Sequence, residues 1–296
     1  MKNLLVFFAI CFLFSSLAYA ENFKNTDEQL NEKTFGQFMS WVFDGKKSPE
    51  KVTIETSNEW QQLSINQSNY AVWIGHATYL INNGDINILT DPIFSERASP
   101  IGFTGPKRMI PPAMNLEDLP KIDAVVVSHN HYDHFDIWSL KKLHKLNPET
   151  IFMVPAGDKK RLIKAGLTHV FEMGWWDTKQ ISKTTFHFTP VQHWSKRGFF
   201  DRNKSLWGGW FMKTEDLSLY HAGDTGYSSD FKTTYERLGA PDYSFIPIGA
   251  YDPRWFMKDS HVNPEEAVQI ALDLKTSYSF GMHWGTFILT DEPVTE

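Results

Sequence analysis

The sequence reads Val127-Ser128-His129-Asn130-His131-Tyr132-Asp133-His134 at the point where an apolar run ends. Three histidines and an aspartate therefore lie within six residues, and neutral imidazole with carboxylate suits zinc, iron or manganese. Side chains two residues apart on an extended segment point the same way, so His129 and His131 can bind one metal ion. The chain then turns, which directs Asp133 and His134 to a second position. Two metal ions side by side form a hydrolytic centre rather than a structural clip.

Further candidate ligands lie downstream, each at the end of an expected strand or in a tight turn. His193 follows the strand-like run 185–191, and His283 ends the run 278–282. Asp224 lies in Ala-Gly-Asp-Thr-Gly-Tyr, where glycines allow the backbone to turn sharply. The predicted ligands of one metal ion are His129, His131 and His193, those of the other are Asp133, His134 and His283, and Asp224 bridges the two.

The first twenty residues have the pattern of a secretory signal peptide. Lys2 supplies the positive start, Leu4 to Phe14 the apolar stretch, and Ala18-Tyr19-Ala20 the small-residue cleavage site. The alternative is an uncleaved anchor, although the apolar run is short for a membrane span. Cleavage would remove Cys11, the only cysteine, so the mature chain would have no disulfide. The sequence therefore predicts a periplasmic or extracellular protein.

Composition limits the remaining possibilities. A length of 296 residues with 42% hydrophobic residues suits one large domain, which we expect over residues 71–296. Residues 21–70 form a polar extension with one apolar island at 35–43. We expect that island to be a short helix packed on the domain; a lip touching a membrane is the alternative. The net charge of −6 argues against a nucleic-acid partner.

Hydrophobic patterning predicts an α/β protein. Helical stretches are expected at 137–146, 159–165 and 264–274. The last begins with Asn263 as cap and Pro264 at the first position. Strands mixed with helices, with ligands at strand ends, favour a four-layer αββα sandwich. The expected strands cover 71–74, 78–81, 86–90, 124–128, 151–154, 185–189, 209–214, 217–221 and 243–248.

Several segments outside the histidine motif resemble a known family. The chain is similar to the metallo-β-lactamase superfamily and, more closely, to the family of N-acyl-phosphatidylethanolamine-hydrolysing phospholipase D. The resemblance runs from about Trp73 to Leu289. Its most specific segments are Ile246-Pro247-Ile248-Gly249-Ala250-Tyr251 and Pro253-Arg254-Trp255-Phe256-Met257-Lys258. This resemblance implies the metallo-β-lactamase fold.

The resemblance also implies an activity and roles for individual residues. The activity would be phosphodiester hydrolysis of N-acyl-phosphatidylethanolamine or related glycerophospholipids, with two Zn²⁺ and a bridging hydroxide that attacks phosphorus. Asp224 would hold the metals, while Tyr132 and His261 would contact the headgroup, with His261 steadying the phosphate or the leaving group. Asp91 would orient ligand groups, although a turn-capping aspartate is an equal alternative. His76 is expected to be structural. The implied partners are a phospholipid substrate and a membrane surface, and a homodimer is left open.

Two other functions remain open from the sequence. The same metal chemistry would serve a lactonase acting on a small molecule. A metal-binding envelope protein without catalysis could also retain the fold. The complete ligand set argues against this alternative, because loss of catalysis usually permits loss of ligands. A β-lactamase is disfavoured, because its typical zinc ligand set includes a cysteine that the mature chain lacks.

Overall fold

The structure, a computed structural model, describes residues 22–28, 33–43, 54, 57 and 69–294. The expected signal peptide, residues 1–20, lies outside the described residues. So does most of the segment between residues 43 and 69 in the expected N-terminal extension.

Two six-stranded sheets form the centre of the molecule. The first has the strand order β1 to β6, and the second has the order β12-β11-β10-β9-β8-β7. The first sheet contains β1 (Tyr70–Gly75), β2 (Thr78–Asn82), β3 (Asn87–Thr90), β4 (Ala124–Val126), β5 (Ile151–Pro155) and β6 (Val170–Met173). The second contains β7 (Thr178–Ile181), β8 (Thr184–Thr189), β9 (Gly209–Lys213), β10 (Ser218–His221), β11 (Tyr243–Pro247) and β12 (Tyr278–Met282).

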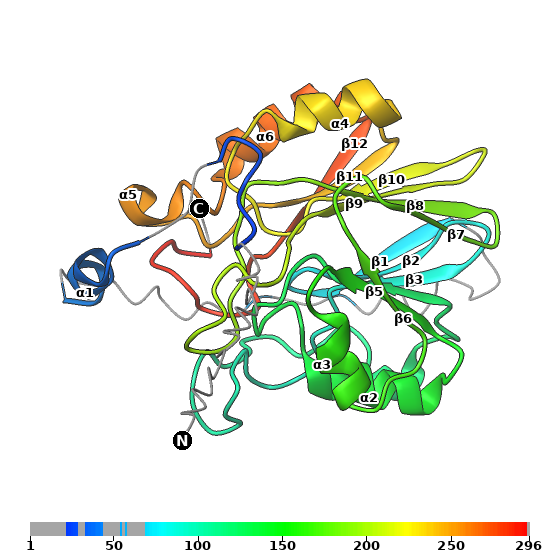
Figure 1. Cartoon of the computed structure of the whole chain (residues 1–296), viewed down its shortest axis with the longest axis horizontal. Coiled ribbons are helices and arrows are strands. Elements are labelled where there is room, and N and C mark those ends of the chain that lie inside the picture. Colours follow the sequence, from blue (N-terminus) through cyan, green and yellow to red (C-terminus); the bar gives the residue numbers. More distant parts are fainter. Residues whose placement is uncertain (1–21, 29–32, 44–53, 55–56, 58–68, 295–296) are drawn as a thin grey trace, which may run out of the picture.

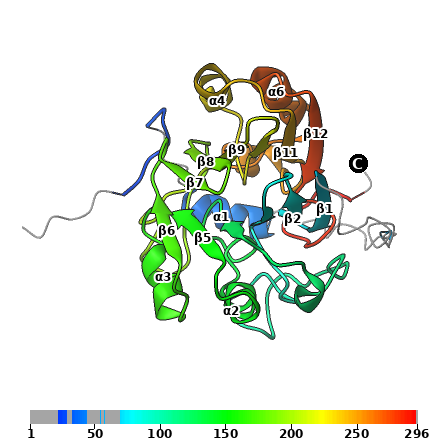
Figure 2. The ribbon, with the colours of Figure 1, turned by 90° about the vertical axis from the view of Figure 1, so that its right-hand side faces the viewer.

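Helices cover the outer faces of both sheets, so the expected four-layer αββα sandwich is confirmed (Figure 1). On the first sheet lie α2 (Ile137–Leu146) and α3 (Lys159–Lys164); on the second lie α4 (Asp230–Leu238) and α6 (Pro264–Leu274). The view along the sheets separates the two helix layers from the two sheets (Figure 2). Short helices complete the described elements: α1 (Phe35–Phe43), a 3₁₀ turn (Leu116–Asp118) and α5 (Arg254–Met257).

Side chains of the central strands alternate between the two faces of each sheet, and apolar residues occur on both faces. On β4, Ala124 and Val126 belong to the core between the sheets, whereas Val125 belongs to the core beneath α2. On β5, Met153 faces the first core, and Phe152 and Val154 face the second. Because successive strand residues point to opposite faces, strands buried on both sides require a layer on each side.

The observed helices follow the local signals in the sequence. The expected start of α6 is confirmed: Asn263 accepts a hydrogen bond from the Glu266 N–H, and the Glu266 side chain accepts one from the Asn263 N–H. The apolar island at 35–43 is helix α1, as expected. Its Trp41 ring stacks on Phe256 of α5 at 5.2 Å. Among the described residues, no helix combines the length and apolar character that crossing a membrane requires.

Strand direction places one set of loops at a single end of the sandwich. β3 to β6 run parallel to one another, and so do β10 to β12, while β8 and β10 each pair antiparallel with β9. The loops that follow β3, β4, β8, β10, β11 and β12 therefore emerge together. Every ligand predicted from the sequence lies in this set of loops or at its edge.

Candidate metal centre

The structure gathers all seven predicted metal ligands at this end. Ligand-capable atoms of His129, His131, His193 and Asp224 lie within 4.8 Å of one another and form the first group. A second group of the same compactness contains Asp133, His134 and His283, joined by His76. The division of the six other ligands matches the one expected from the sequence, but His76 joins the second group, and Asp224 also forms a third group with His261 and His283.

Three imidazole nitrogens converge in the first group. Nε2 of His129 lies 2.9 Å from Nδ1 of His131, and that Nδ1 lies 3.3 Å from Nε2 of His193. Zinc at about 2.0–2.1 Å from each ligand in tetrahedral geometry would separate its nitrogens by about 3.3 Å. The spacing therefore fits a single small cation.

Electrostatics favour neutral imidazoles in the first group. Burial lowers the pKa of His131 to about 4 and holds the pKa values of His129 and His193 well below their usual range. These rings are therefore neutral at physiological pH, with lone pairs available to a metal. His193 is also held in place, because its Nδ1 donates a 3.0 Å hydrogen bond to the Ser260 carbonyl.

The second group is organised around carboxylates. Asp133 Oδ2 lies 3.5 Å from Nε2 of His134 and 3.3 Å from Nε2 of His283. Burial alone would lower the pKa of His283, but Asp224 and Asp133 raise it to about 9. The pKa of His134 is likewise raised, against its burial, by Asp224, Asp133 and Asp91. Positive charge is therefore favourable beside these carboxylates, and a divalent cation bound here would supply it.

Asp224 lies between the two groups. Its Oδ2 is 3.1 Å from Nε2 of both His134 and His283, and 3.8 Å and 3.9 Å from Nε2 of His129 and His193. The carboxylate is 2% exposed, and its other oxygen, Oδ1, is buried without a hydrogen-bond partner. A buried carboxylate oxygen without a donor is costly unless a cation compensates it. This geometry suits a residue that bridges two metal ions.

Gly223 allows the Asp224 loop to reach the histidine motif. Its φ of +64° lies in the left-handed region, and a Cβ there would stand 2.6 Å from the Cβ of Ser128. Only glycine tolerates both conditions. The absent side chain therefore brings Asp224 against the segment that carries His129.

Asp91 supports the second group from beneath, as the resemblance implied. The carboxylate is fully buried and accepts hydrogen bonds from the Ser128 N–H at 2.7 Å and the Ser128 hydroxyl at 2.6 Å. Its Oδ2 also lies 2.8 Å from Nδ1 of His134, so Nε2 of that ring is turned toward the metal groups. This arrangement favours the orienting role over that of an isolated turn cap.

Replacing Asp91 by alanine should lower the free energy of unfolding by about 3 kcal/mol, because the change leaves buried donors on Ser128 and His134 without an acceptor. Metal affinity should fall about 10- to 100-fold. Urea denaturation and a zinc titration measure the two effects. Asp118→Ala, which removes an exposed carboxylate, is the matched control. A free energy of unfolding within about 0.5 kcal/mol of the unchanged protein would contradict the supporting role.

His76 contributes more than the sequence indicated. It is buried in the turn between β1 and β2, and its Nε2 lies 2.9 Å from Asp133 Oδ2. Burial lowers its pKa to about 3, so the neutral ring donates to that carboxylate. Its ring centroid is 4.0 Å from that of His283. His76 therefore positions Asp133, and the Gly-His-Ala-Thr segment was the only sign of this in the sequence.

The two predicted substrate contacts occupy different settings. The Tyr132 hydroxyl donates to the Arg197 carbonyl at 2.7 Å, and the residue lines a surface depression that contains none of the seven predicted ligands. His261 is nine-tenths buried, with its Nδ1 lacking a hydrogen-bond partner and 3.9 Å from Asp224 Oδ2. Arg254 fixes this loop by donating to the His261 carbonyl at 2.7 Å and pairing with Glu266 of α6 at 2.6 Å. The Pro-Arg-Trp-Phe-Met-Lys segment thus positions His261.

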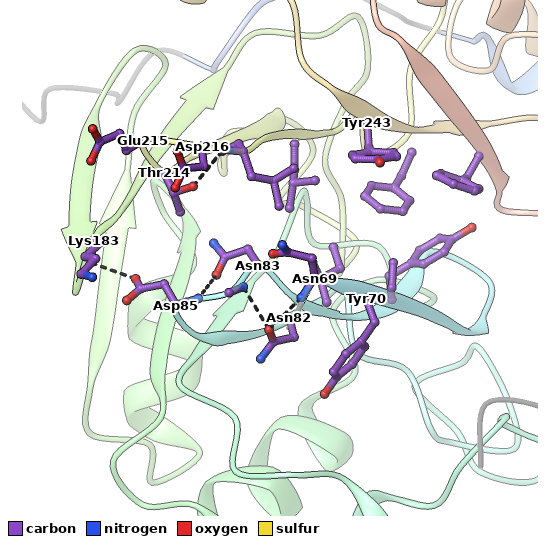
Figure 3. Close-up of a pocket in the computed structure, with 18 of the residues that line it drawn as sticks. Asn69, Tyr70, Asn82, Asn83, Asp85, Lys183, Thr214, Glu215, Asp216 and Tyr243 are labelled. Atoms are coloured by element: carbon purple, nitrogen blue, oxygen red, sulfur yellow. Dashed lines mark hydrogen bonds between the residues drawn. The ribbon is translucent and has the colours of Figure 1, made fainter. Parts of the chain in front are cut away.

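A separate cavity of about 730 Å³ lies at the opposite end of the sandwich (Figure 3). Its lining includes Asn82 at the end of β2, Asn83 and Asp85 of the β2–β3 turn, and Glu215 and Asp216 of the β9–β10 turn. None of the histidines of the metal groups lines it. The predicted ligands therefore lie at the other end, away from this cavity.

Comparison with known proteins agrees with this geometry. A family model described as "Beta-lactamase superfamily domain" matches residues 86–284. Among solved structures, a possible metal-dependent hydrolase from Veillonella parvula superposes with a TM-score of 0.61 at 19% identity, covering 76% of this chain and 88% of that one. At this identity the likeness concerns the fold alone.

Two curated relatives are more similar in sequence. The N-acyl-phosphatidylethanolamine-hydrolyzing phospholipase D 1 of Caenorhabditis elegans is 43% identical over 228 residues, which cover 74% of this chain and 64% of the relative. The mitochondrial enzyme of that name in Saccharomyces cerevisiae is 40% identical over 233 residues, covering 75% and 49%. The matched region thus spans about half to two thirds of these relatives.

Proposed function

Because the chain belongs to the β-lactamase superfamily domain family, we propose that it is a binuclear metal-dependent phosphodiesterase of the phospholipase D type. The observation that carries the proposal is the position of Asp224 Oδ2, 3.1 Å from His134 and His283 and 3.8–3.9 Å from His129 and His193. One carboxylate that reaches two ligand groups suits two adjacent metal ions. Zinc is the proposed metal, since three nitrogens at this spacing match its tetrahedral preference.

The proposed substrate is N-acyl-phosphatidylethanolamine or a related glycerophospholipid. Support comes from the 43% and 40% identity to relatives that carry this activity in their names. Water would attack phosphorus, and the bond from phosphorus to the N-acylethanolamine oxygen would break. The products are phosphatidic acid and an N-acylethanolamine, which takes up a proton. No residue of the protein becomes covalently attached.

The chain contributes charge, orientation and a hydrogen-bond donor to this reaction. Divalent metal ions, when bound, would acidify a water molecule and polarise a phosphoryl oxygen. Asp224 keeps the two ligand groups at a fixed separation, and Asp91 and His76 hold His134 and Asp133 in orientation. Burial lowers the pKa of His261 to about 4. Its neutral ring can donate a hydrogen bond to the phosphate or to the departing oxygen.

We expect His261→Ala to lower kcat about 100-fold, the usual contribution of a positioned proton donor. Metal content should stay unchanged, because each ligand group is complete without His261. The measurements are phosphatidic acid formation by mass spectrometry and metal content by elemental analysis. His144→Ala, on α2 away from the site, is the matched control. Loss of a metal ion in His261→Ala would make this residue a ligand instead, since it also lies within 4.8 Å of Asp224 and His283.

A further inference from the structure

Two loops at the metal end carry the three most exposed large apolar side chains among the described residues. Loop A, residues 95–108, presents Phe103, which is 84% exposed. Loop B, residues 196–204, presents Phe199 and Phe200, which are 92% and 89% exposed. Single exposed apolar residues are common on protein surfaces. Three almost fully exposed phenylalanines in two loops at the same end of the molecule are unusual and indicate an interaction surface.

Both loops adjoin the candidate metal centre. Loop A follows β3 and loop B follows β8, so both emerge at the end that carries the ligands (Figure 1). Arg197 ties loop B to the histidine motif: its Nη1 donates to the Asn130 carbonyl at 3.0 Å, and its guanidinium lies 4.1 Å from the Tyr132 ring centroid. A surface depression of about 630 Å³ is lined by Arg97 and Gly102 of loop A, Arg197 of loop B, and Tyr132.

The charge of the two loops opposes that of the whole chain. Loops A and B together contain seven basic and two acidic residues, a net charge of +5, whereas the chain carries −6. Lys107, Lys196 and Lys204 are exposed, with Lys107 paired to Glu96 at 2.8 Å. Arg108 and Arg197 are partly buried and donate to backbone carbonyls, so the exposed charge comes mainly from the lysines. In loop B the phenylalanines are flanked by basic residues on both sides, Lys196 and Arg197 before them and Arg202 after them. Overall composition concealed this local concentration of positive charge.

Aromatic tips between basic side chains match the interface of an anionic bilayer. Phenylalanine enters the boundary between headgroups and acyl chains, while lysine and arginine interact with anionic headgroups. A protein partner would require a continuous complementary face, whereas a bilayer accepts separate protruding tips. We propose that loops A and B dock the protein onto an anionic phospholipid bilayer, with the depression beside Tyr132 opening onto the membrane surface. This inference rests on the proposed function, for which it supplies the route of the lipid substrate.

Vesicle flotation of the metal-loaded protein tests the docking surface. The unchanged protein should bind vesicles containing phosphatidylglycerol at least about tenfold more strongly than vesicles of phosphatidylcholine alone, and salt should weaken this binding. The double change Phe199→Ser with Phe200→Ser should reduce binding at least about tenfold. Leu272→Ser, on α6 and 64% exposed in the unchanged protein, is the matched control and should bind normally. Phe103→Ser is an independent test if the double variant loses its metal.

Vesicle binding and lipid hydrolysis are measured separately, so the docking proposal and the proposed phosphodiesterase function can fail independently. Asp224→Asn should float with anionic vesicles like the unchanged protein even when it no longer hydrolyses lipid. Equal binding to neutral and anionic vesicles, or unaltered binding after both phenylalanine changes, would overturn the docking proposal. A different result would also overturn it: the unchanged protein does not bind vesicles, and analytical ultracentrifugation shows that it is a dimer which the double change converts to a monomer. Loops A and B would then form an interface between two copies of the chain.

Discussion

Asp224→Asn is expected to lower kcat about 100-fold or more while the protein remains folded. An amide has nearly the shape of the carboxylate but lacks its negative charge, which faces both ligand groups from a fully buried position. Removing such preorganised electrostatic stabilisation typically costs several kcal/mol in the transition state. The effect should appear in kcat with any phosphodiester substrate, since the proposed role of the residue is at the reacting centre.

Steady-state kinetics, thermal unfolding and metal analysis of Asp224→Asn are all needed, because together they distinguish a loss of catalysis from a loss of fold or of metal. Asp216→Asn, an exposed aspartate in the β9–β10 turn at the far end, is the matched control. The expected pattern is a large loss in kcat with a small change in Tm. Near-full turnover with two bound metal ions would show that Asp224 does not act as the bridge.

Removal of metal should reduce hydrolysis to the background rate. Two ligand groups of this kind predict two ions per chain, and activity should return in proportion to zinc until two equivalents are bound. Bound ions also stabilise the fold by mass action, about 4 kcal/mol when free zinc is a thousand times its Kd. Chelation should therefore also lower the Tm.

Elemental analysis after zinc reconstitution gives the number of ions directly. His129→Ala should lose at least one ion, whereas His187→Ala, on β8 and outside the ligand groups, should retain two. Full activity at one equivalent of zinc, or full activity after chelation, would contradict the binuclear assignment.

The sequence predicted most of the sandwich because the central strands are buried on both faces. β4 and β5 read as continuous apolar runs, and the start of α6 is marked by Asn263, Pro264 and Glu266. The edge strands β6 and β7 were not predicted. β7 is at most half-buried along its length, so it shows little of the apolar pattern that identifies a strand. Helix α4 was missed because its apolar residues are few and its polar face dominates.

The metal centre was predictable to the extent that its ligands cluster in the sequence. His129, His131, Asp133 and His134 come from one short motif, and that motif required partners from other strand ends. His76 was underestimated because its contact with Asp133 spans 57 residues and is created by the packing of two loops. The location of the positive charge was also hidden, because loops A and B are about 90 residues apart and meet only at the end of the sandwich.

The central claim is that the protein hydrolyses a phospholipid by attack of water at phosphorus. Following the oxygen atom of water into the products tests this claim most directly. The zinc-loaded protein is incubated with N-acyl-phosphatidylethanolamine in oxygen-18 water, and the products are analysed by mass spectrometry. The account predicts one label in the phosphate of phosphatidic acid and none in the N-acylethanolamine, because water attacks phosphorus. Label in released fatty acid or in the N-acylethanolamine, or cleavage of lactones without any phosphodiester hydrolysis, would contradict it.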